Sequence, residues 1–193
     1  MTSLPRILCM ASILSACGGG SPGSVTGVIH GTSFSISDAI SATITNPGQT
    51  GPEQSAVILM STTSNLCADL QATPVSHPNE KLIGIILIDV NGTTFNTPTA
   101  PGTYTIFQGS GTPPAKAASF GASVLDATCK DVPTSDATAT TGTVTLSAVS
   151  GNVFSGSFDV TLDSGDHVTG SFDPEECPGL QAATGSTTTP SCM

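Results

Sequence analysis

Residues 153–172, VFSGSFDVTLDSGDHVTGSF, decide the fold of this chain. Apolar and polar side chains alternate on both sides of Ser164-Gly165-Asp166, which is the period of a strand with one buried face. Gly165 can adopt the positive φ that a short hairpin loop requires. The stretch therefore predicts a β-hairpin with a three-residue loop at residues 164–166.

The preceding segment extends this hairpin to three strands. Residues 143–147 alternate in the same way. A slip of one residue in strand pairing turns every side chain to the other face, so the apolar faces of the three strands must coincide. We therefore predict a meander in which Val144, Phe158 and Phe172 form one inward row, with Phe158 opposite Phe172 and Val144 beside Phe158.

Two segments further upstream carry equally local signals. Residues 82–90 are the most apolar run after residue 16, and their length and β-branching predict a strand that is covered on both faces. Asn91-Gly92 follows directly and is typical of a hairpin turn. Ser64 can cap a short helix over residues 65–71.

These segments together predict an all-β domain. Many short strands separated by turn signals favour an antiparallel β-sandwich, with an up-and-down β-barrel as the alternative and at most one short helix, near residues 65–71. The composition agrees, because Ser, Thr and Val are abundant whereas the residues that favour long helices are scarce.

The N-terminal segment has the parts of an export signal. Arg6 gives a weakly positive start, residues 7–14 are apolar, and Ala16 is a small residue at the end of the run. The run is much shorter than the ~20 residues that span a bilayer. An ordinary secretory peptide cleaved near Ala16 is one interpretation.

A second interpretation rests on Leu14-Ser15-Ala16-Cys17, which resembles the lipobox of bacterial lipoproteins. The resemblance implies a signal peptide at residues 1–16 and a Cys17 that carries fatty acyl groups such as palmitate. Gly18 follows that cysteine, and by resemblance to sorting in Gram-negative envelopes this favours the outer membrane, on its periplasmic or surface-exposed face. Residues 17–23 then form a flexible tether, and residues 24–193 form a single domain.

The charge balance excludes one class of partner. The chain has 14 acidic and 4 basic residues, with a formal net charge of −10. Such a chain repels nucleic acids, so we expect no nucleic-acid partner.

Four cysteines follow Cys17: Cys67, Cys129, Cys177 and Cys192. An even number in an exported domain predicts two disulfides, for which three pairings can form. We favour Cys177–Cys192, which would close an otherwise loose C-terminal segment, and therefore Cys67–Cys129. Zinc would need close pairs such as C-x-x-C, which the sequence lacks.

The candidate chemical groups are sparse. Asp159, Asp163, Asp166 and Asp173 surround the last hairpin and could bind calcium, although the EF-hand spacing is absent. His30, His77 and His167 are far apart in the sequence. No catalytic pattern stands out, so we expect no catalytic residue, no metal ligand and no cofactor.

The layout resembles a loose group of bacterial lipoproteins that are themselves predicted and have no assigned activity. The matching pieces are Leu66-Cys67, Asp126-Ala127-Thr128-Cys129, Gly142-Thr143-Val144-Thr145-Leu146, Gly156-Ser157-Phe158-Asp159, Val168-Thr169-Gly170-Ser171-Phe172-Asp173, Cys177 and Cys192. The resemblance supports an all-β fold with disulfides and implies no activity.

We therefore expect a lipid-anchored envelope protein that is not an enzyme. It would bind the membrane through its anchor and would bind an envelope or extracellular protein or ligand as an interaction module. A structural envelope component is the alternative, and a hydrolytic enzyme or a calcium-dependent adhesion module is less favoured.

Overall fold

The computed structural model describes residues 21–47, 52–71, 74–109, 111–184 and 190–193. The predicted signal peptide, Cys17 and most of the predicted tether lie outside these residues. No helix among the described residues is both long and apolar enough to cross a membrane.

The all-β prediction is confirmed. An eleven-stranded sheet runs in the order β1, β11, β10, β9, β7, β8, β5, β3, β2, β12, with β6 beside β5, and β4 and β13 form a second small sheet. The strands are β1 Gly23–Thr26, β2 Asp38–Pro47, β3 Pro52–Ser61, β4 Val75–Ser76, β5 Lys81–Asn91, β6 Thr94–Asn96, β7 Gly102–Ile106, β8 Lys116–Val124, β9 Ala137–Ser150, β10 Val153–Leu162, β11 His167–Phe172, β12 Glu175–Glu176 and β13 Ser191–Cys192.

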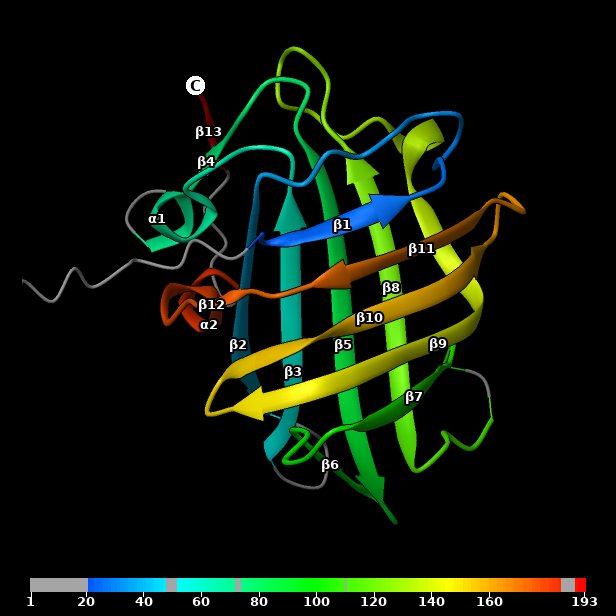
Figure 1. Cartoon of the computed structure of the whole chain (residues 1–193). Helices are drawn as coiled ribbons and strands as arrows, with labels where there is room; N and C mark the ends of the chain where they lie inside the picture. The colour runs from blue at the N-terminus through cyan, green and yellow to red at the C-terminus, as the bar shows by residue number, and fades with distance from the viewer. Residues whose placement is uncertain (1–20, 48–51, 72–73, 110, 185–189) are drawn as a thin grey trace, which may run out of the picture.

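The main sheet curls over its own inner face. In Figure 1, β1, β11, β10 and β9 cross in front of β2, β3, β5 and β8, so the molecule has two layers. The layers are joined at one side because β9 pairs with both β7 and β8. The sheet is mixed rather than purely antiparallel, since β7 pairs with β8, and β12 with β2, in parallel.

The main core lies between these two layers. It is built from the inward side chains of both layers, and Phe120 of β8 meets Phe158 of β10 with ring centroids 5.1 Å apart. Burying an apolar side chain of this size stabilises a fold by roughly 1.5–3 kcal/mol. The largest fully buried members of this core are Tyr104, Phe120, Phe154, Phe172, Ile29, Ile58, Met60, Ile83, Ile85, Leu87 and Leu146.

A smaller core covers the outer face of β2. Helix α1, Leu66–Gln71, confirms the one helix that the sequence predicts, but a second helix, α2, spans Gly179–Thr184, and a single 3₁₀ turn spans Pro133–Ser135. The limit of one helix was therefore wrong. Leu180 of α2 is buried against Ile40 and Ile44 of β2. Helix α2 is therefore stabilised by tertiary packing, and the weak helix propensity of its own sequence does not predict it.

The disulfide pairing differs from the one favoured by the sequence. Cys67 is bonded to Cys177 and Cys129 to Cys192, with Cα–Cα distances of 5.6 and 5.5 Å. The first bond links α1 to the chain that enters α2. The second forms because Cys192 lies on β13, whose pairing with β4 brings it beside the loop of Cys129. Two disulfides indicate a non-cytoplasmic, oxidising compartment.

The meander of β9, β10 and β11 forms as predicted, but one register is shifted. Val144 lies opposite Phe158, whereas Phe158 lies opposite Gly170 and Phe172 lies opposite Gly156. All three predicted inward side chains are buried. The hydrogen bond from Leu162 N to Asp166 O places the three-residue loop at residues 163–165, one residue earlier than predicted, and this moves the pairing by two residues.

The domain also begins slightly earlier than predicted. Gly23, assigned to the tether from the sequence, opens β1 and pairs with Phe172. The carbonyl of Pro22 accepts a hydrogen bond from Asp173 N at 3.0 Å. The backbone groups of these residues are therefore satisfied by the sheet rather than by solvent.

Candidate functional site

The four carboxylates of the proposed calcium site do not converge. Asp159 contacts His167 at 2.7 Å, Asp163 accepts from Thr138 N at 3.2 Å, and Asp173 accepts from the Ser155 hydroxyl at 2.7 Å. Among the residues that the structure describes, no three His, Cys, Asp or Glu side chains are grouped to hold a metal ion.

Asp166 instead organises the hairpin loop. Its Oδ2 accepts hydrogen bonds from the Ser164 hydroxyl and from His30 N, both at 2.8 Å. These bonds lower the pKa of Asp166 below its usual value, with the Ser164 hydroxyl contributing most. The carboxylate therefore stabilises local structure.

The three histidines are also kept apart. His30 Nε2 lies 3.0 Å from Asp136 O, His77 contacts Asp69 at 2.8 Å, and His167 contacts Asp159. Each has its own partner, so the fold does not assemble a histidine cluster.

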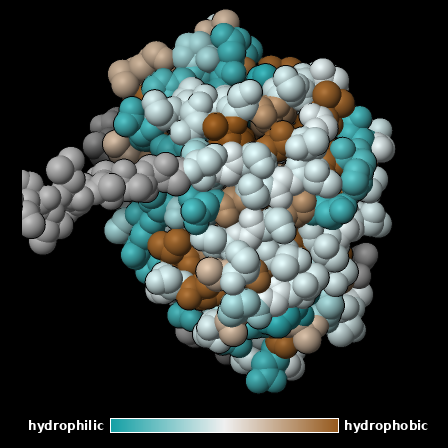
Figure 2. Space-filling view, viewed as in Figure 1, coloured by the Kyte–Doolittle hydropathy of each residue, from teal (hydrophilic) through white to brown (hydrophobic). Residues whose placement is uncertain are grey.

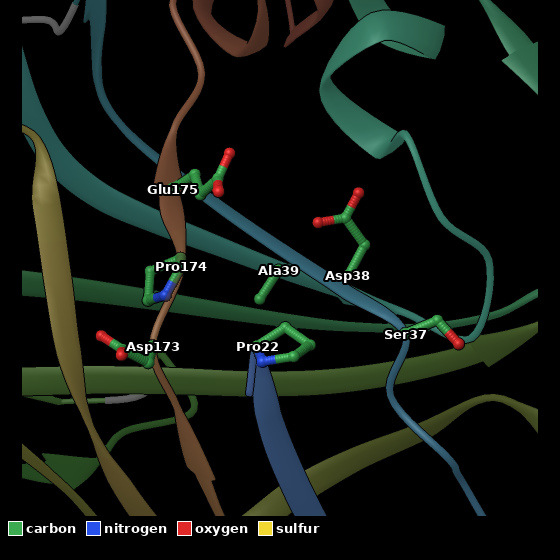
Figure 3. Close-up of a pocket in the computed structure, with 7 residues that line it drawn as sticks. All are labelled: Pro22, Ser37, Asp38, Ala39, Asp173, Pro174 and Glu175. Carbon is green, nitrogen blue, oxygen red and sulfur yellow. The ribbon is translucent and has the colours of Figure 1, made fainter. Parts of the chain in front are cut away.

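A polar notch of about 310 Å³ lies where β11 passes into β12, between the starts of β1 and β2. Asp38, Asp173 and Glu175 line it. Figure 3 shows the carboxylate of Asp173 turned away from the other two, which agrees with its bond to Ser155. Asp38 accepts from Leu66 N at 2.8 Å and so caps α1. Two of the three acids thus have structural roles.

Sequence reasoning missed a buried carboxylate, Glu80, which is only 3% exposed. Its oxygens accept hydrogen bonds from the hydroxyls of Ser61 and Thr63, at 2.7 and 2.8 Å, and from His77 N at 3.2 Å. These bonds join the end of β3 to the turn before β5. Asn79-Glu80 resembles a solvated turn in the sequence, so no local pattern distinguishes it.

A second missed cluster joins Tyr104, Asp89 and Lys116. The Tyr104 hydroxyl donates to Asp89 at 2.8 Å, and Lys116 Nζ lies 3.0 Å from Asp89 and 3.1 Å from the Tyr104 oxygen. Burial raises the pKa of Tyr104 to about 12; the hydrogen bond with Lys116 opposes this rise and the contact with Asp89 adds to it. Burial alone would lower the pKa of Lys116, but its hydrogen bonds to Tyr104 and Asp89 outweigh that effect and raise it. Near neutral pH the cluster therefore holds a protonated tyrosine beside a charged lysine.

The chain has one tyrosine and no tryptophan, so the ionisation of Tyr104 can be followed by its ultraviolet absorbance alone. We expect a midpoint near pH 12 in the native protein and near 10 in denaturant. Because the pKa is higher in the folded state, the stability it contributes is present below pH 10 and is lost as the pH rises from 10 to 12. Asp89→Asn should lower the native midpoint. A native midpoint near 10 would contradict the buried hydrogen-bonded geometry.

A larger recess than the notch lies on the outer face of β3, β5 and β8. Across this face, cross-strand pairs place Leu59, Gly84, Gly121 and Thr138 in one row. The flanking rows are Val57–Ile86–Ser119 on one side and Leu82–Ser123 on the other. We call this set of nine residues the outer groove. Its volume is about 660 Å³, within the range of roughly 300–1,000 Å³ that ligand sites occupy.

The outer groove corrects one sequence expectation. Residues 82–90 were expected to be covered on both faces, yet Ile86 is 39% exposed. Ile83, Ile85 and Leu87 face the main core, while α1 and α2 cover only the neighbouring β2–β3 side of the outer face. The apolar outer surface of the sheet therefore extends past the part that α1 and α2 cover, and this uncovered part is exposed to solvent.

The opposite face of the molecule is mostly neutral to polar, with scattered apolar residues. Figure 2 shows this side as mostly pale, neutral residues over β1, β11, β10 and β9. Cross-strand pairing aligns hydroxyls in the row Ser24, Ser171, Ser157, Thr145 and Thr103. Neighbouring hydroxyls bond to one another, as Ser24 and Ser171 do at 3.0 Å. This face is an ordinary solvated sheet surface and serves as the natural control for the outer groove.

No protein-family model, curated protein or solved structure matches this chain. The candidate site therefore rests on its own geometry. The outer groove combines volume, apolar lining and exposure, which neither the notch nor the polar clusters do.

Proposed function

We propose that this chain is a lipid-anchored cell-envelope protein that binds a partner through the outer groove. The observation that carries this proposal is the exposure of Ile86 on a strand that continues the helix-covered apolar surface. Exposed contiguous apolar surface marks interaction sites in soluble domains. Among the described residues the other exposed large apolar side chains are Val28 and Met193, and neither lies within a strand.

The anchor part of the proposal rests on the sequence Leu14-Ser15-Ala16-Cys17. Lipid on Cys17 would tether the domain through the short segment before β1. The outer membrane is the favoured site because Gly18 follows the cysteine. The disulfides agree with an exported domain, since they form in oxidising compartments.

The alternatives are less well supported. A purely structural envelope component would need no recess, and the groove argues against it. A hydrolytic enzyme would need a nucleophile and a base within hydrogen-bond reach in a cleft. A calcium-dependent adhesion module would need carboxylates that converge, whereas Asp159, Asp163 and Asp173 each bind a different protein group.

Photocrosslinking in cells that produce the full chain tests the proposal. Benzoylphenylalanine replaces Ile86 in the groove, and in a matched control it replaces Ser157 on the hydroxyl face. We expect a discrete crosslinked product from position 86 and none from position 157. Equal products from both positions, or none from either, would contradict a binding role for the groove.

The same cells test the anchor with Cys17→Ser. We expect the unchanged protein in the membrane fraction with a mass increased by acyl groups, and the variant without that added mass. Because a loss of anchoring would leave the groove intact, the crosslinking and fractionation results can fail independently. A membrane-bound, unacylated wild-type protein would contradict the anchor.

A further inference from the structure

Two glycines, Gly84 and Gly121, form the floor of the outer groove. Neither the backbone conformation nor the packing of the fold requires glycine at these positions. Gly84 and Gly121 lie opposite each other on β5 and β8, and neither has a positive φ. A Cβ at Gly84 would meet nothing closer than the Leu59 side chain at 3.6 Å, and one at Gly121 nothing closer than Ala137 O at 3.8 Å. Both are ordinary contacts, so alanine would fit at either position.

Four other strand glycines behave differently. A Cβ at Gly23, Gly142, Gly156 or Gly170 would overlap the backbone of a neighbouring strand. Glycine within a strand costs roughly 0.5–1 kcal/mol relative to alanine, and it often marks a close approach by a ligand or another chain. At Gly84 and Gly121 no backbone or side chain among the described residues comes that close. The space above the two glycines is therefore open to a group from another molecule.

Inside the main core, aromatic rings occupy the space above strand glycines. The ring of Phe158 lies over Gly170, and the ring of Phe172 lies over Gly156, with Phe172 Cζ 2.9 Å from where a Cβ would stand. Aromatic rings cover glycines on neighbouring strands because the flat ring fits the missing side-chain volume. On the outer face, Gly84 and Gly121 are two such glycines opposite each other, and no aromatic ring in the described part of the chain covers either of them.

The rim of the groove adds a charge requirement. Asp131 and Asp136 line one wall, both exposed, and Asp163 lines the adjoining recess. No described lysine or histidine forms an ion pair with Asp131 or Asp136, since the three pairs present involve Asp69, Asp89 and Asp159. A partner that carries positive charge would complement this wall, and the net charge of −10 favours its approach.

We propose that the outer groove binds a protein segment whose aromatic side chain packs over Gly84 and Gly121, with a neighbouring lysine or arginine facing Asp131 and Asp136. This inference rests on the proposed function and specifies the chemistry of the partner. Leu59 and Thr138 close the ends of the glycine row, while Ile86 and Leu82 supply apolar sides for the ring.

Nuclear magnetic resonance with model peptides tests this inference. The full chain, with its disulfides formed and held in detergent micelles, is titrated with acetyl-Lys-Phe-Lys-amide while the amide signals of Gly84 and Gly121 are followed. Acetyl-Lys-Leu-Lys-amide and acetyl-Glu-Phe-Glu-amide are matched controls for the ring and the charge. We expect saturable shifts at both glycines with the first peptide and at least ~10-fold weaker binding of the other two.

Two variants locate the site. Gly84→Ala should weaken the Lys-Phe-Lys peptide at least ~10-fold by filling the floor, whereas Asp131→Asn with Asp136→Asn should weaken it by removing the charge at exposed positions that the fold does not need. Equal binding of the three peptides, or shifts scattered away from the groove, would overturn the inference. If position 86 nevertheless crosslinks to a partner in cells, the proposed function survives and only the aromatic–cationic chemistry fails.

Discussion

The double substitution Cys67→Ala, Cys177→Ala is expected to lower the free energy of unfolding by about 4–5 kcal/mol. The bond closes a sequence separation of 110 residues, and such a loop restricts the unfolded chain strongly in the chain-entropy model. Cys177 is also fully buried in the smaller core with Leu66 and Leu180. Loss of the bond therefore weakens the packing of α2 on β2 and also increases the conformational entropy of the unfolded chain.

The double substitution Cys129→Ala, Cys192→Ala is the matched control. Its sequence separation of 63 gives a similar chain-entropy effect, but Cys192 is exposed on a two-residue strand. We expect a smaller loss, measured by chemical denaturation without reductant. A loss equal to or greater than that of the first pair would contradict the role assigned to the smaller core.

Gly170→Ala is expected to cost about 3 kcal/mol, at the upper end of what overpacking a core costs. Its Cβ would overlap Ser24 O and the ring of Phe158. Relief would need movement of β1 or of a core aromatic side chain, and both are held by their neighbours on the sheet. Gly156→Ala should behave similarly, because its Cβ would overlap Thr145 O.

Ser171→Ala is the control for that substitution on the adjacent, outward position of β11. It removes one exposed hydroxyl bond to Ser24 and should change stability by less than about 0.5 kcal/mol. Thermal unfolding of both variants checks the prediction. A Gly170→Ala protein as stable as Ser171→Ala would show that Phe158 does not fill the space over Gly170.

The strands in which apolar and polar residues alternate could be predicted from the sequence. The alternation around Val144 and Phe158 correctly paired β9 with β10, and Gly165, at φ +87°, correctly marked the hairpin loop. The loop position could not be obtained from alternation alone, because a shift of two residues keeps every side chain on its face. The contact of each phenylalanine with a glycine decides between those registers.

Long-range pairings were beyond the reach of local patterns. The predicted bond Cys177–Cys192 followed from nearness in sequence, whereas the parallel pairing of β13 with β4 brings Cys192 to Cys129. The helix α2 was missed for the same reason, since Gln181 bonds to the backbone of Thr45 and Leu180 packs on β2. Neither contact leaves a periodic signal near residue 180.

The candidate site was only partly visible in the sequence. The most apolar run was recognised, but its composition suggested cover on both faces, and only the arrangement of α1 and α2 shows where the cover stops. Gly84 within that run was the available signal, because a glycine inside a strand often marks a close approach. Its partner Gly121 becomes meaningful only once β5 and β8 are known to pair.

The free energies of unfolding of Gly84→Ala and Gly121→Ala test most directly whether the outer groove is kept open for a partner. If the fold does not need these glycines, both variants should be as stable as the unchanged protein or more stable by about 0.5–1 kcal/mol. Losses of the size expected for Gly170→Ala would show that the glycines serve packing, and the groove would then carry no argument for binding.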